Sequence, residues 1–546
     1  MDGQDRKYEG ENDKRKIIES LRRRTMPSNG ANAKSGKPQT TVDKKRSMSI
    51  AKVKERMERL RHDIVNNVGD QFDDMMSDVM SELEAINKFE GINALHLDET
   101  EKYRDKRKAE KNGALPEKQF LQRNSVLTDL YEIKHFRTIY NFFIVILIIL
   151  SINTAIYDLL HTGSTNLGMR LIMRGFAKFS VVIEIWLVMV ASTFGAYGAC
   201  SYWANRRVTV SQKFYKLKAW DYGWILLFIA YQIALIVLPT KAIIWAQLPP
   251  ISSVVILTEE TRMVMKMHAF VRSTAPIASA YKPHTKGKEF VFPGFSKFLY
   301  FMFAPTLIYR DSYPRTKEIR WRFALWHFTE VALVIFNMAF LFERFLLPPF
   351  EEFGKHPFDV RNFILAVYGS CCPGMLVFLS GFYCLLHAWM NAAAEVMRFG
   401  DRLFYKDWWN STAYATYYRH WNVVVHDWLY TYIYKDMYEI VTSGNRTISM
   451  FAVFFVSSLF HEYILAFTFG FFFPVSFGMF GVVGYALVFL IRTSHASGNM
   501  FLLFSLTTGF GTMISLYAME YFARVNCPRF NDGIVDFFIP RSFFCF

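Results

Sequence analysis

Long uninterrupted apolar runs dominate this chain and limit what it can fold into. A helix needs about 20 apolar residues to cross a bilayer core about 30 Å thick. Nine such runs are present, so the sequence predicts an all-α polytopic membrane protein with about nine transmembrane helices. The runs are Thr138–Leu160, Phe179–Cys200, Tyr222–Ala246, Ile251–Phe270, Phe323–Leu347, Phe363–Met390, Ile448–Phe471, Phe473–Ile491 and Met500–Glu520.

The run Ile251–Phe270 is the weakest of the nine, because four charged residues interrupt it. Segments 201–221 and 271–322 are both rich in Lys and Arg, which favours a cytosolic location for both. If they share a side, the chain must cross twice between them, so the weak run also crosses. We therefore expect a cytosolic N-terminus and a lumenal C-terminus. The interrupting residues are Glu259, Glu260, Arg262 and Lys266.

The part before the first span differs in character from the rest. Residues 1–60 are basic and poor in apolar side chains, which predicts a disordered cytosolic tail. Within 61–90, seven apolar residues from Ile64 to Ile86 recur at spacings of 4, 4, 3, 4, 4 and 3. This 11-residue repeat predicts an amphipathic helix that self-associates, with attachment to the membrane surface or to its own domain as the alternative. A linker (91–125), a transmembrane domain (126–520) and a lumenal tail (521–546) should follow.

Composition narrows the classes of function. The formal net charge of +15 is explained by basic cytosolic segments, and no nucleic-acid-binding module is present. No cleavable signal peptide is expected, because the first 120 residues are strongly hydrophilic. We expect neither a metal site nor a permanently bound cofactor. Cys527 and Cys545 follow the last span and could form a disulfide if that tail faces an oxidising lumen.

One ionisable residue stands out within the apolar runs. His461 lies near the middle of Ile448–Phe471, and ionisable side chains inside a membrane are candidates for function. We expect its imidazole to be buried and therefore neutral, which would suit a general base acting on an alcohol. The alternative is a structural histidine bonded to a neighbouring helix.

A polar, aromatic-rich segment precedes that helix and should lie on the cytosolic face. Its aromatic rings, together with Lys406, Arg419, Lys435 and Arg446, could stack on an adenine and neutralise phosphates. Asn422 could donate its amide to a developing oxyanion. The alternative is an aromatic belt at the headgroup level. The segment contains the motif FYKDWWN, formed by Phe404, Tyr405, Lys406, Asp407, Trp408, Trp409 and Asn410.

These residues carry a resemblance to a known family. FYKDWWN resembles the FYxDWWN signature of the sterol and diacylglycerol acyltransferases within the membrane-bound O-acyltransferase family. His461 in SSLFHEY and Asn422 in WNVVVHDWLY match that family's histidine and its polar partner. His268–Arg272, Ala304–Arg315 and the paired tail cysteines are similar to the sterol-esterifying branch. The resemblance implies the family's helical fold and acyl transfer from long-chain acyl-CoA to the 3β-hydroxyl of cholesterol or a related sterol.

The resemblance also implies roles for individual residues. His461 would take the proton of the sterol hydroxyl, and Asn422 and Trp421 would place the thioester. Arg446 stands where the family often has Lys, and His420 departs from the small polar residue of vertebrate relatives. An endoplasmic reticulum membrane enzyme that forms a homodimer or homotetramer is implied, with acyl-CoA, sterol and membrane lipids as its partners. The residues expected to line the acyl-CoA tunnel are Tyr418, Tyr434, Arg446 and Ser457.

Three other functions remain open from the sequence. A diacylglycerol acyltransferase would use the same base and the same acyl donor. A proton-coupled transporter could use His461 and Glu462 as a relay, although FYKDWWN would then have no role. A non-catalytic lipid-binding or sterol-sensing relative is disfavoured by the presence of both Asn422 and His461.

Overall fold

The computed structural model describes residues 55–58, 115–165, 167–209, 214–281, 291–491, 495–529 and 533–545. The chain divides into two units, Met1–Lys102 and Tyr103–Phe546. In the first unit, Glu55–Glu58 are helical and exposed. The rest of the predicted basic tail, the predicted self-association helix (61–90) and the predicted linker up to residue 114 lie outside the described residues. Helices α3 to α18 all belong to the second unit.

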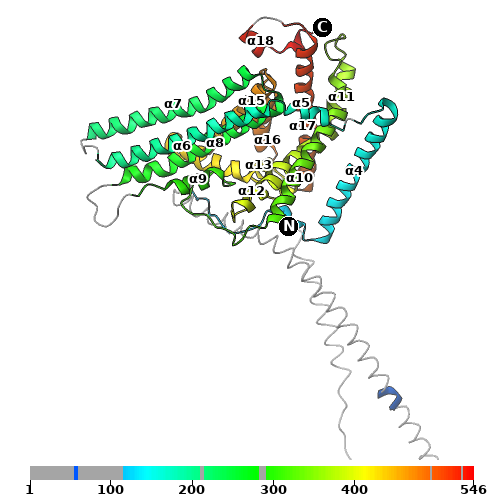
Figure 1. Cartoon of the computed structure of the whole chain (residues 1–546). Helices are drawn as coiled ribbons and strands as arrows, with labels where there is room; N and C mark the ends of the chain where they lie inside the picture. The colour runs from blue at the N-terminus through cyan, green and yellow to red at the C-terminus, as the bar shows by residue number, and fades with distance from the viewer. Residues whose placement is uncertain are drawn as a thin grey trace, which may run out of the picture. The chain divides into compact units, whose positions relative to one another are not determined.

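Seven helical segments in the described part of the chain are long and apolar enough to cross a membrane. Each overlaps one of the nine predicted spans, so the all-helical membrane fold is confirmed (Figure 1). Within the same part of the chain, β-pairing is limited to isolated bridges. The seven are α4 (Lys134–Thr162), α6 (Phe179–Thr209), α7 (Phe214–Ala246), α10 (Trp321–Leu341) with η1 (Phe342–Leu346) and η2 (Pro348–Phe350), α11 (Val360–Phe382) with η3 (Tyr383–Trp389) and α12 (Met390–Val396), α15 (Arg446–Phe469), and α17 (Ala496–Asn526).

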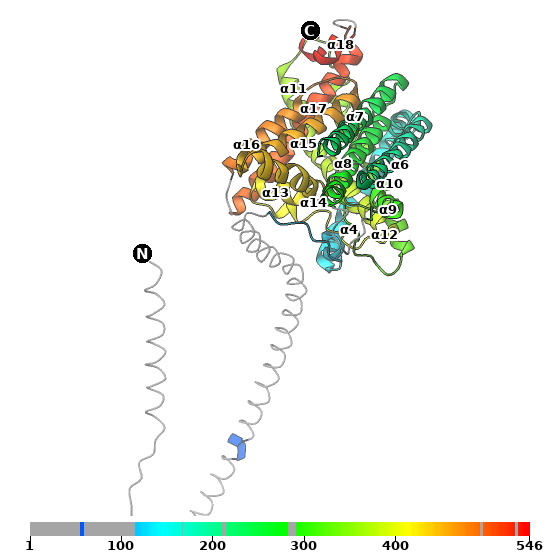
Figure 2. The same cartoon turned by 90° about the vertical axis from the view of Figure 1, so that its left-hand side faces the viewer.

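The weak predicted span forms a long helix, α8 (Pro250–Ala280). It is too polar to count among the seven, yet its 31 residues reach roughly 46 Å at 1.5 Å per residue. Figures 1 and 2 show α8 beside α6 and α7, and it also packs against α15. Lys266, one of the four charged residues of the predicted span, is buried and donates from Nζ to the carbonyl oxygens of Phe301 (2.5 Å) and Ala304 (2.7 Å). These two bonds attach α8 to the end of α9 (Phe295–Phe303).

The eighth predicted run is shorter in the structure than in the sequence. A π-helix, η7 (Phe477–Gly484), continues into α16 (Tyr485–Leu490), and together they cover 14 residues. A turn precedes η7, with Val475 N bonded to Phe473 O, and the backbone becomes extended at Ile491. The shortened element packs against α15.

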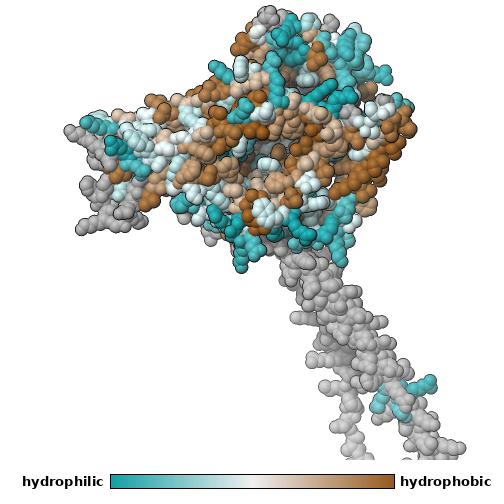
Figure 3. Space-filling model, viewed as in Figure 1, coloured by the Kyte–Doolittle hydropathy of each residue, from teal (hydrophilic) through white to brown (hydrophobic). Residues whose placement is uncertain are grey.

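Helix α4 exposes most of its apolar surface. Only 6 % of its most apolar window is buried, and Phe142 and Leu160 are 65 % and 78 % exposed. Figure 3 shows apolar side chains over α4 and the middle of this face, with polar side chains toward its two ends. An apolar helix with this little protein contact is suited to a lipid environment.

Helices α11 and α17 cross with very little space between their backbones. A Cβ atom on Gly511 would lie 2.6 Å from the Cα of Cys371, and one on Gly374 would lie 3.3 Å from the Cα of Gly511. Small residues permit this kind of close approach between membrane helices. The crossing holds Phe378 and Phe382 of α11 beside the motif 404–410.

The chain after α17 folds back on that helix. Cys527 and Cys545 form a disulfide, with Cα atoms 6.0 Å apart. Glu520, fully buried in α17, accepts hydrogen bonds from the backbone amides of Arg541 and Ser542, both at 3.0 Å. The tail contains α18 (Ile534–Phe538) and the turn η8 (Arg541–Phe543).

Short helices connect the long ones. They are α3 (Val126–Leu130), α5 (Met169–Gly175), η4 (Trp408–Asn410), α13 (Tyr414–Trp421), α14 (Val423–Leu429), η5 (Tyr430–Tyr434) and η6 (Met437–Val441). All of these except α3 and α5 belong to the polar segment that precedes α15. This segment packs against α8 through Trp428, whose Nε1 donates to Met265 O at 2.9 Å, and it also contacts α11 and α15.

Candidate active site

Helix α15 carries His461 and is well defined at both ends. Asn445 caps its start, because its side-chain oxygen accepts from Thr447 N and Ile448 N at 3.1 and 3.2 Å. Gly470 ends it in the left-handed conformation with φ 76°. Phe454, Ser458, Glu462 and Ala466 form its buried face. His461 lies on the flank of that face.

The side chain of His461 is exposed, which corrects the prediction that it is buried. The buried residues of α15 recur every four positions, and this series includes Glu462. His461, one position earlier, points in a different direction and stays accessible. His461 Nδ1 lies 2.7 Å from the carbonyl oxygen of Ser457. A carbonyl oxygen can only accept, so Nδ1 carries the hydrogen and Nε2 is the nitrogen with a free lone pair. The imidazole is therefore oriented to act as a base through Nε2.

Glu462 serves a different part of the structure from His461. It is only 3 % exposed, and its carboxylate accepts from Tyr517 Oη at 3.0 Å and from Phe477 N at 3.0 Å. Phe477 is the first residue of η7, so Glu462 fixes the start of that π-helix on α15. These contacts give no support to a His461–Glu462 relay.

The π-helix η7 places one aromatic ring beside the candidate base. The ring centroid of Phe480 lies 5.3 Å from that of His461 and 5.5 Å from that of Tyr418. Gly481 lies against Ser458, and Gly484 lies against the hydroxyl of Tyr418, where larger residues would clash. Phe480 thus links His461 on α15 to Tyr418 on α13.

Asn422 stands at the break between α13 and α14. Its backbone angles, φ −139° and ψ 88°, interrupt the helix, and its Oδ1 accepts from Val425 N at 3.1 Å as the cap of α14. Because Oδ1 is used in this way, the side chain presents its Nδ2 amide to other groups. An amide donor held by a cap is suited to stabilising a developing negative charge.

The motif 404–410 holds this break in place through backbone hydrogen bonds. Val423 N donates to Phe404 O at 2.9 Å, and Lys406 N donates to His420 O at 2.8 Å. Phe404, Tyr405 and Trp408 are buried, whereas Asn410 is exposed. The motif is therefore bonded to the residues on either side of Trp421 and Asn422, and its buried rings pack in the protein core.

Trp421 packs in an aromatic cluster that the motif shares with α11. Its ring stacks on Phe378 with centroids 4.4 Å apart and an interplanar angle of 8°. Trp408 meets it edge-on at 4.9 Å, and Phe382 lies 5.1 Å away. These rings hold Trp421, and through it the adjacent Asn422, against the membrane helices.

Polar contacts surround the second half of the motif. His420, which is buried, has its Nδ1 3.6 Å from Asp407 Oδ1. Asn499 at the start of α17 donates from Nδ2 to Trp409 O at 2.7 Å and to Ser411 O at 2.9 Å. The motif is thus fixed to α17 as well as to α11.

The residues expected to contact acyl-CoA fall into two groups. Tyr418 and Ser457 belong to the neighbourhood of His461, through Phe480 and through the bond from Nδ1. Tyr434 instead belongs to a ladder of stacked rings that runs along α14, η5 and η6, and Arg446 is exposed at the first turn of α15. The ladder consists of His426, Tyr430, Tyr434 and Tyr438, with successive centroids 6.4, 5.6 and 5.9 Å apart.

A sequence model of the membrane-bound O-acyltransferase family matches residues 224–519, which include the motif, Asn422 and His461. The chain belongs to the membrane-bound O-acyltransferase family. Sterol O-acyltransferase 1 of Mus musculus is 37 % identical to it over 495 residues, covering 89 % of this chain and 90 % of that protein. Sterol O-acyltransferase 2 of Mus musculus is 38 % identical over 434 residues (78 % and 81 %), and that of Homo sapiens is 37 % identical over 432 residues (79 % and 80 %).

The structure adds residues to this O-acyltransferase site that sequence patterns did not indicate. A buried polar network lies behind the motif, where Tyr405 Oη is 2.7 Å from His387 Nδ1 and accepts from Leu127 N at 3.3 Å. Ser125 joins it through Asn391, whose Nδ2 donates to Ser125 Oγ at 3.0 Å. Ser125 and Leu127 lie more than 250 positions before Asn391 and Tyr405, so no local pattern relates them and only the tertiary contacts reveal the network. Among the described residues, no cluster of His, Cys, Asp and Glu could hold a metal ion.

Proposed function

We propose that this chain transfers a long-chain acyl group from acyl-CoA to the 3β-hydroxyl of cholesterol or a related sterol. The observation that carries the proposal is the hydrogen bond from His461 Nδ1 to the Ser457 carbonyl. It leaves Nε2 as a proton acceptor on an exposed flank of α15, which is what base catalysis on an alcohol requires. Membership of the family indicates that the reaction is acyl transfer, and the sterol O-acyltransferases among the relatives indicate that a sterol accepts the acyl group.

The reaction then proceeds by direct transfer. His461 Nε2 takes the proton of the sterol hydroxyl as the hydroxyl oxygen attacks the carbonyl carbon of the thioester. The tetrahedral intermediate collapses with cleavage of the carbon–sulfur bond, and the CoA thiolate leaves with the proton from the imidazolium. The products are one steryl ester and one CoA, and no covalent acyl-enzyme forms.

Asn422 and Trp421 assist at the thioester. The Nδ2 amide of Asn422 donates to the oxyanion that develops on the carbonyl oxygen, and removal of such a donor typically costs about 10²–10³-fold in rate. The stacked ring of Trp421 holds the break between α13 and α14, here called the elbow, in a fixed position. A donor that is already oriented needs no rearrangement when charge develops.

Acyl-CoA is a co-substrate that approaches from the polar segment. Its adenine and phosphates are matched by the aromatic ladder and by the cation Arg446, and its pantetheine passes Tyr418 and Ser457 toward His461. Tyr434 contributes through the ladder. This route brings the anionic head of acyl-CoA from water and leaves the apolar sterol to enter from the bilayer.

The enzyme lies in the endoplasmic reticulum membrane, with a cytosolic N-terminus and a lumenal C-terminus. The length of α8 and its packing against three spans support its crossing, and the Cys527–Cys545 disulfide suits an oxidising lumen. Self-association through residues 61–90 gives a homodimer or homotetramer.

The deciding experiment measures acyl transfer in membranes that contain the full-length chain. Labelled oleoyl-CoA is supplied with cholesterol or with diacylglycerol, and the labelled esters are separated. We expect steryl ester from the wild type and a loss of at least about 10²-fold in His461→Ala, the scale typical of general-base removal. His135→Ala, at an exposed histidine in the first turn of α4, is the matched control and should keep full activity.

Each other outcome has a definite meaning. Triacylglycerol in place of steryl ester would retain the mechanism and replace the acceptor. Equal activity of the wild type and His461→Ala would remove His461 from catalysis. No ester from the wild type with either acceptor would reject acyl transfer to both.

A further inference from the structure

A segment far from the motif in sequence packs directly against it. Residues 115–125, here called the strap, precede the first membrane span and lie before the part of the chain that matches the family model. Arg123 N donates to Gly400 O at 2.9 Å, and Arg402 N donates to Arg123 O at 3.1 Å. The Arg123 guanidinium also binds Asp401, with Nε 2.7 Å from Oδ1. The strap is therefore paired with the chain just before the motif.

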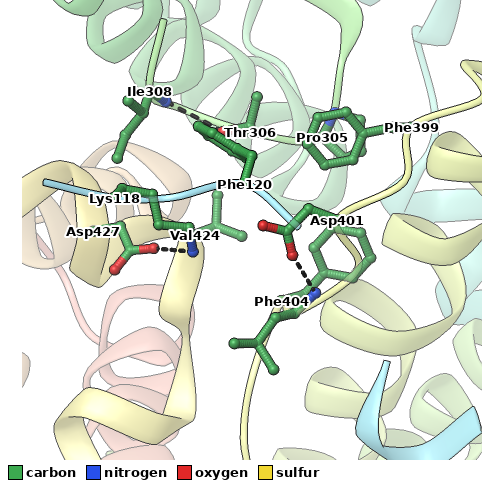
Figure 4. Close-up of a pocket in the computed structure, with 11 residues that line it drawn as sticks. Lys118, Phe120, Pro305, Thr306, Ile308, Phe399, Asp401, Phe404, Val424 and Asp427 are labelled. Carbon is green, nitrogen blue, oxygen red and sulfur yellow. Dashed lines mark hydrogen bonds and ion pairs between the residues drawn. The ribbon is translucent and has the colours of Figure 1, made fainter. Parts of the chain in front are cut away.

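The strap also contacts α14 through one ion pair. Lys118 Nζ lies 2.6 Å from Asp427 Oδ2, and the two side chains are only 18 % and 21 % exposed. Figure 4 shows this pair at one side of a small pocket and Asp401 at the other, with Phe120, Val424 and Phe404 also lining it. Burial by itself would raise the pKa of Asp427, but attraction to Lys118 and a bond with His426 outweigh it and lower that pKa to about 2.

Asp427 sits on the helix that Asn422 caps. α14 is the first part of a helical segment that continues through η5 and η6 to Val441, and Asp427 lies about one turn after Asn422 on the side that meets the strap. The bond from Val423 N to Phe404 O holds its start, and the Lys118–Asp427 pair holds it one turn further on. The next residue, Trp428, donates from Nε1 to Met265 O at 2.9 Å and attaches the helix to α8. Successive residues of a helix point about 100° apart, so the ion pair restrains a side of the helix that the Trp428 bond does not.

We propose that Lys118 is a positioning residue for the acyl transfer, acting through Asp427 to orient α14 and with it the Nδ2 amide of Asn422. The inference rests on the proposed function, because it assigns Asn422 to the oxyanion. The strap is then a working part of the catalytic unit, even though it precedes all of the membrane spans. Loss of the pair tilts α14 and moves the amide, so that the rate of the chemical step falls while the substrates still bind.

The test compares variants of the ion pair in membranes with the full-length chain, oleoyl-CoA and cholesterol. Lys118→Met keeps the length of the side chain without its charge, and Lys118→Asp reverses the charge. We expect kcat to fall by roughly tenfold in Lys118→Met and more in Lys118→Asp, with KM for oleoyl-CoA unchanged, because a 1 Å misplacement can cost about 10²-fold. Lys118→Arg should keep kcat within about twofold of the wild type.

Exchanging the charges of residues 118 and 427 distinguishes a positioning role from a general loss of folded protein. Lys118→Asp combined with Asp427→Lys restores the opposite charges and should recover most of kcat. Glu117→Gln is the control, because the neighbouring strap residue Glu117 pairs with exposed Arg310 and does not contact α14. Thermal unfolding of each purified variant gives the fraction of folded protein, by which kcat is corrected.

Specific results would overturn the proposal. It fails if Lys118→Met and Lys118→Asp keep the wild-type kcat, or if the exchanged pair stays as inactive as the single variants at equal folded fraction. A rise in KM with kcat unchanged would also reject it, because the strap would then affect substrate binding. A wild type without steryl ester activity would instead reject the proposed function itself.

Discussion

At the scale of single residues, orientation distinguishes neighbours that look alike in sequence. His461 and Glu462 are adjacent ionisable groups in one apolar run, yet one is exposed and the other is 3 % exposed with Tyr517 and Phe477 as its donors. Successive residues on a helix differ by 100°, so one faces the packed helices and the next does not. The candidate base His461 is therefore accessible on the same helix that buries Glu462.

Phe480 provides a prediction at this scale. Its ring lies beside the His461 imidazole, so under the proposed mechanism a smaller side chain should admit more water next to the candidate base and the thioester. Phe480→Leu should raise the ratio of oleoyl-CoA hydrolysis to steryl ester formation several-fold. The ratio is measured as CoA released without cholesterol against ester formed with it.

Phe477→Leu is the matched control for this substitution. Phe477 lies on the same π-helix, but its ring contacts Phe455 on α15, 6.0 Å away between centroids. Its hydrolysis ratio should equal that of the wild type. An unchanged ratio in Phe480→Leu would show that the ring does not exclude water from the base.

At the scale of elements, short helices depend on distant segments for their placement. The α13–α14 break, the motif and the strap share backbone hydrogen bonds and ion pairs but are separated by up to about 300 positions in the chain. The eight residues of α13 and the three of η4 are too few to form a stable helix in isolation. Their mutual contacts create the rigid elbow at Asn422.

The Lys118–Asp427 pair predicts a pH dependence for this elbow. The pKa of Asp427 is lowered from 3.8 to about 2, so the folded state binds fewer protons than the unfolded state in this range. Lys118 and His426 together therefore stabilise the folded state through Asp427 by about 2 kcal/mol above pH 4, and this contribution is lost as the pH falls through 2. The free-energy difference between the wild type and Asp427→Asn, from denaturant unfolding in detergent, should shrink between pH 4 and pH 2. A difference that stays constant across this range would contradict the assignment.

At the scale of the whole molecule, the proposed topology depends on how α8 accommodates its charges. Glu259, Arg262 and Lys266 would be costly in lipid, but in the structure they pair with each other and with the end of α9. Trp186 on α6 donates to Glu259 as well, at 2.9 Å. A helix that hydropathy alone excludes can therefore cross the membrane inside the protein.

The nine-span topology predicts which asparagines can be N-glycosylated. The sequons at Asn410 and Asn445 should stay unglycosylated, because both would face the cytosol. Both side chains are exposed in the structure, so a missing glycan there would report the side of the membrane and not burial. A glycosylation tag fused after Phe546 should be modified, and the same tag before Met1 should not.

The readout is the shift in electrophoretic mobility after treatment with a glycosidase. Modification of the N-terminal tag or of Asn410 would reverse the assignment of sides. Modification of neither tag would place both termini in the cytosol and imply an even number of crossings.

The sequence by itself determined the helical membrane class, most of the spans and the segment that contains the site. These follow from local patterns: apolar runs of sufficient length, one histidine within such a run, and the motif at 404–410. Tertiary structure alone decided that His461 is exposed, that Glu462 caps η7, that Lys266 binds the end of α9, and that the strap reaches α14. Each of these depends on contacts between residues distant in the chain, and the periodicity of a single segment carries no information about which distant segment will cover it.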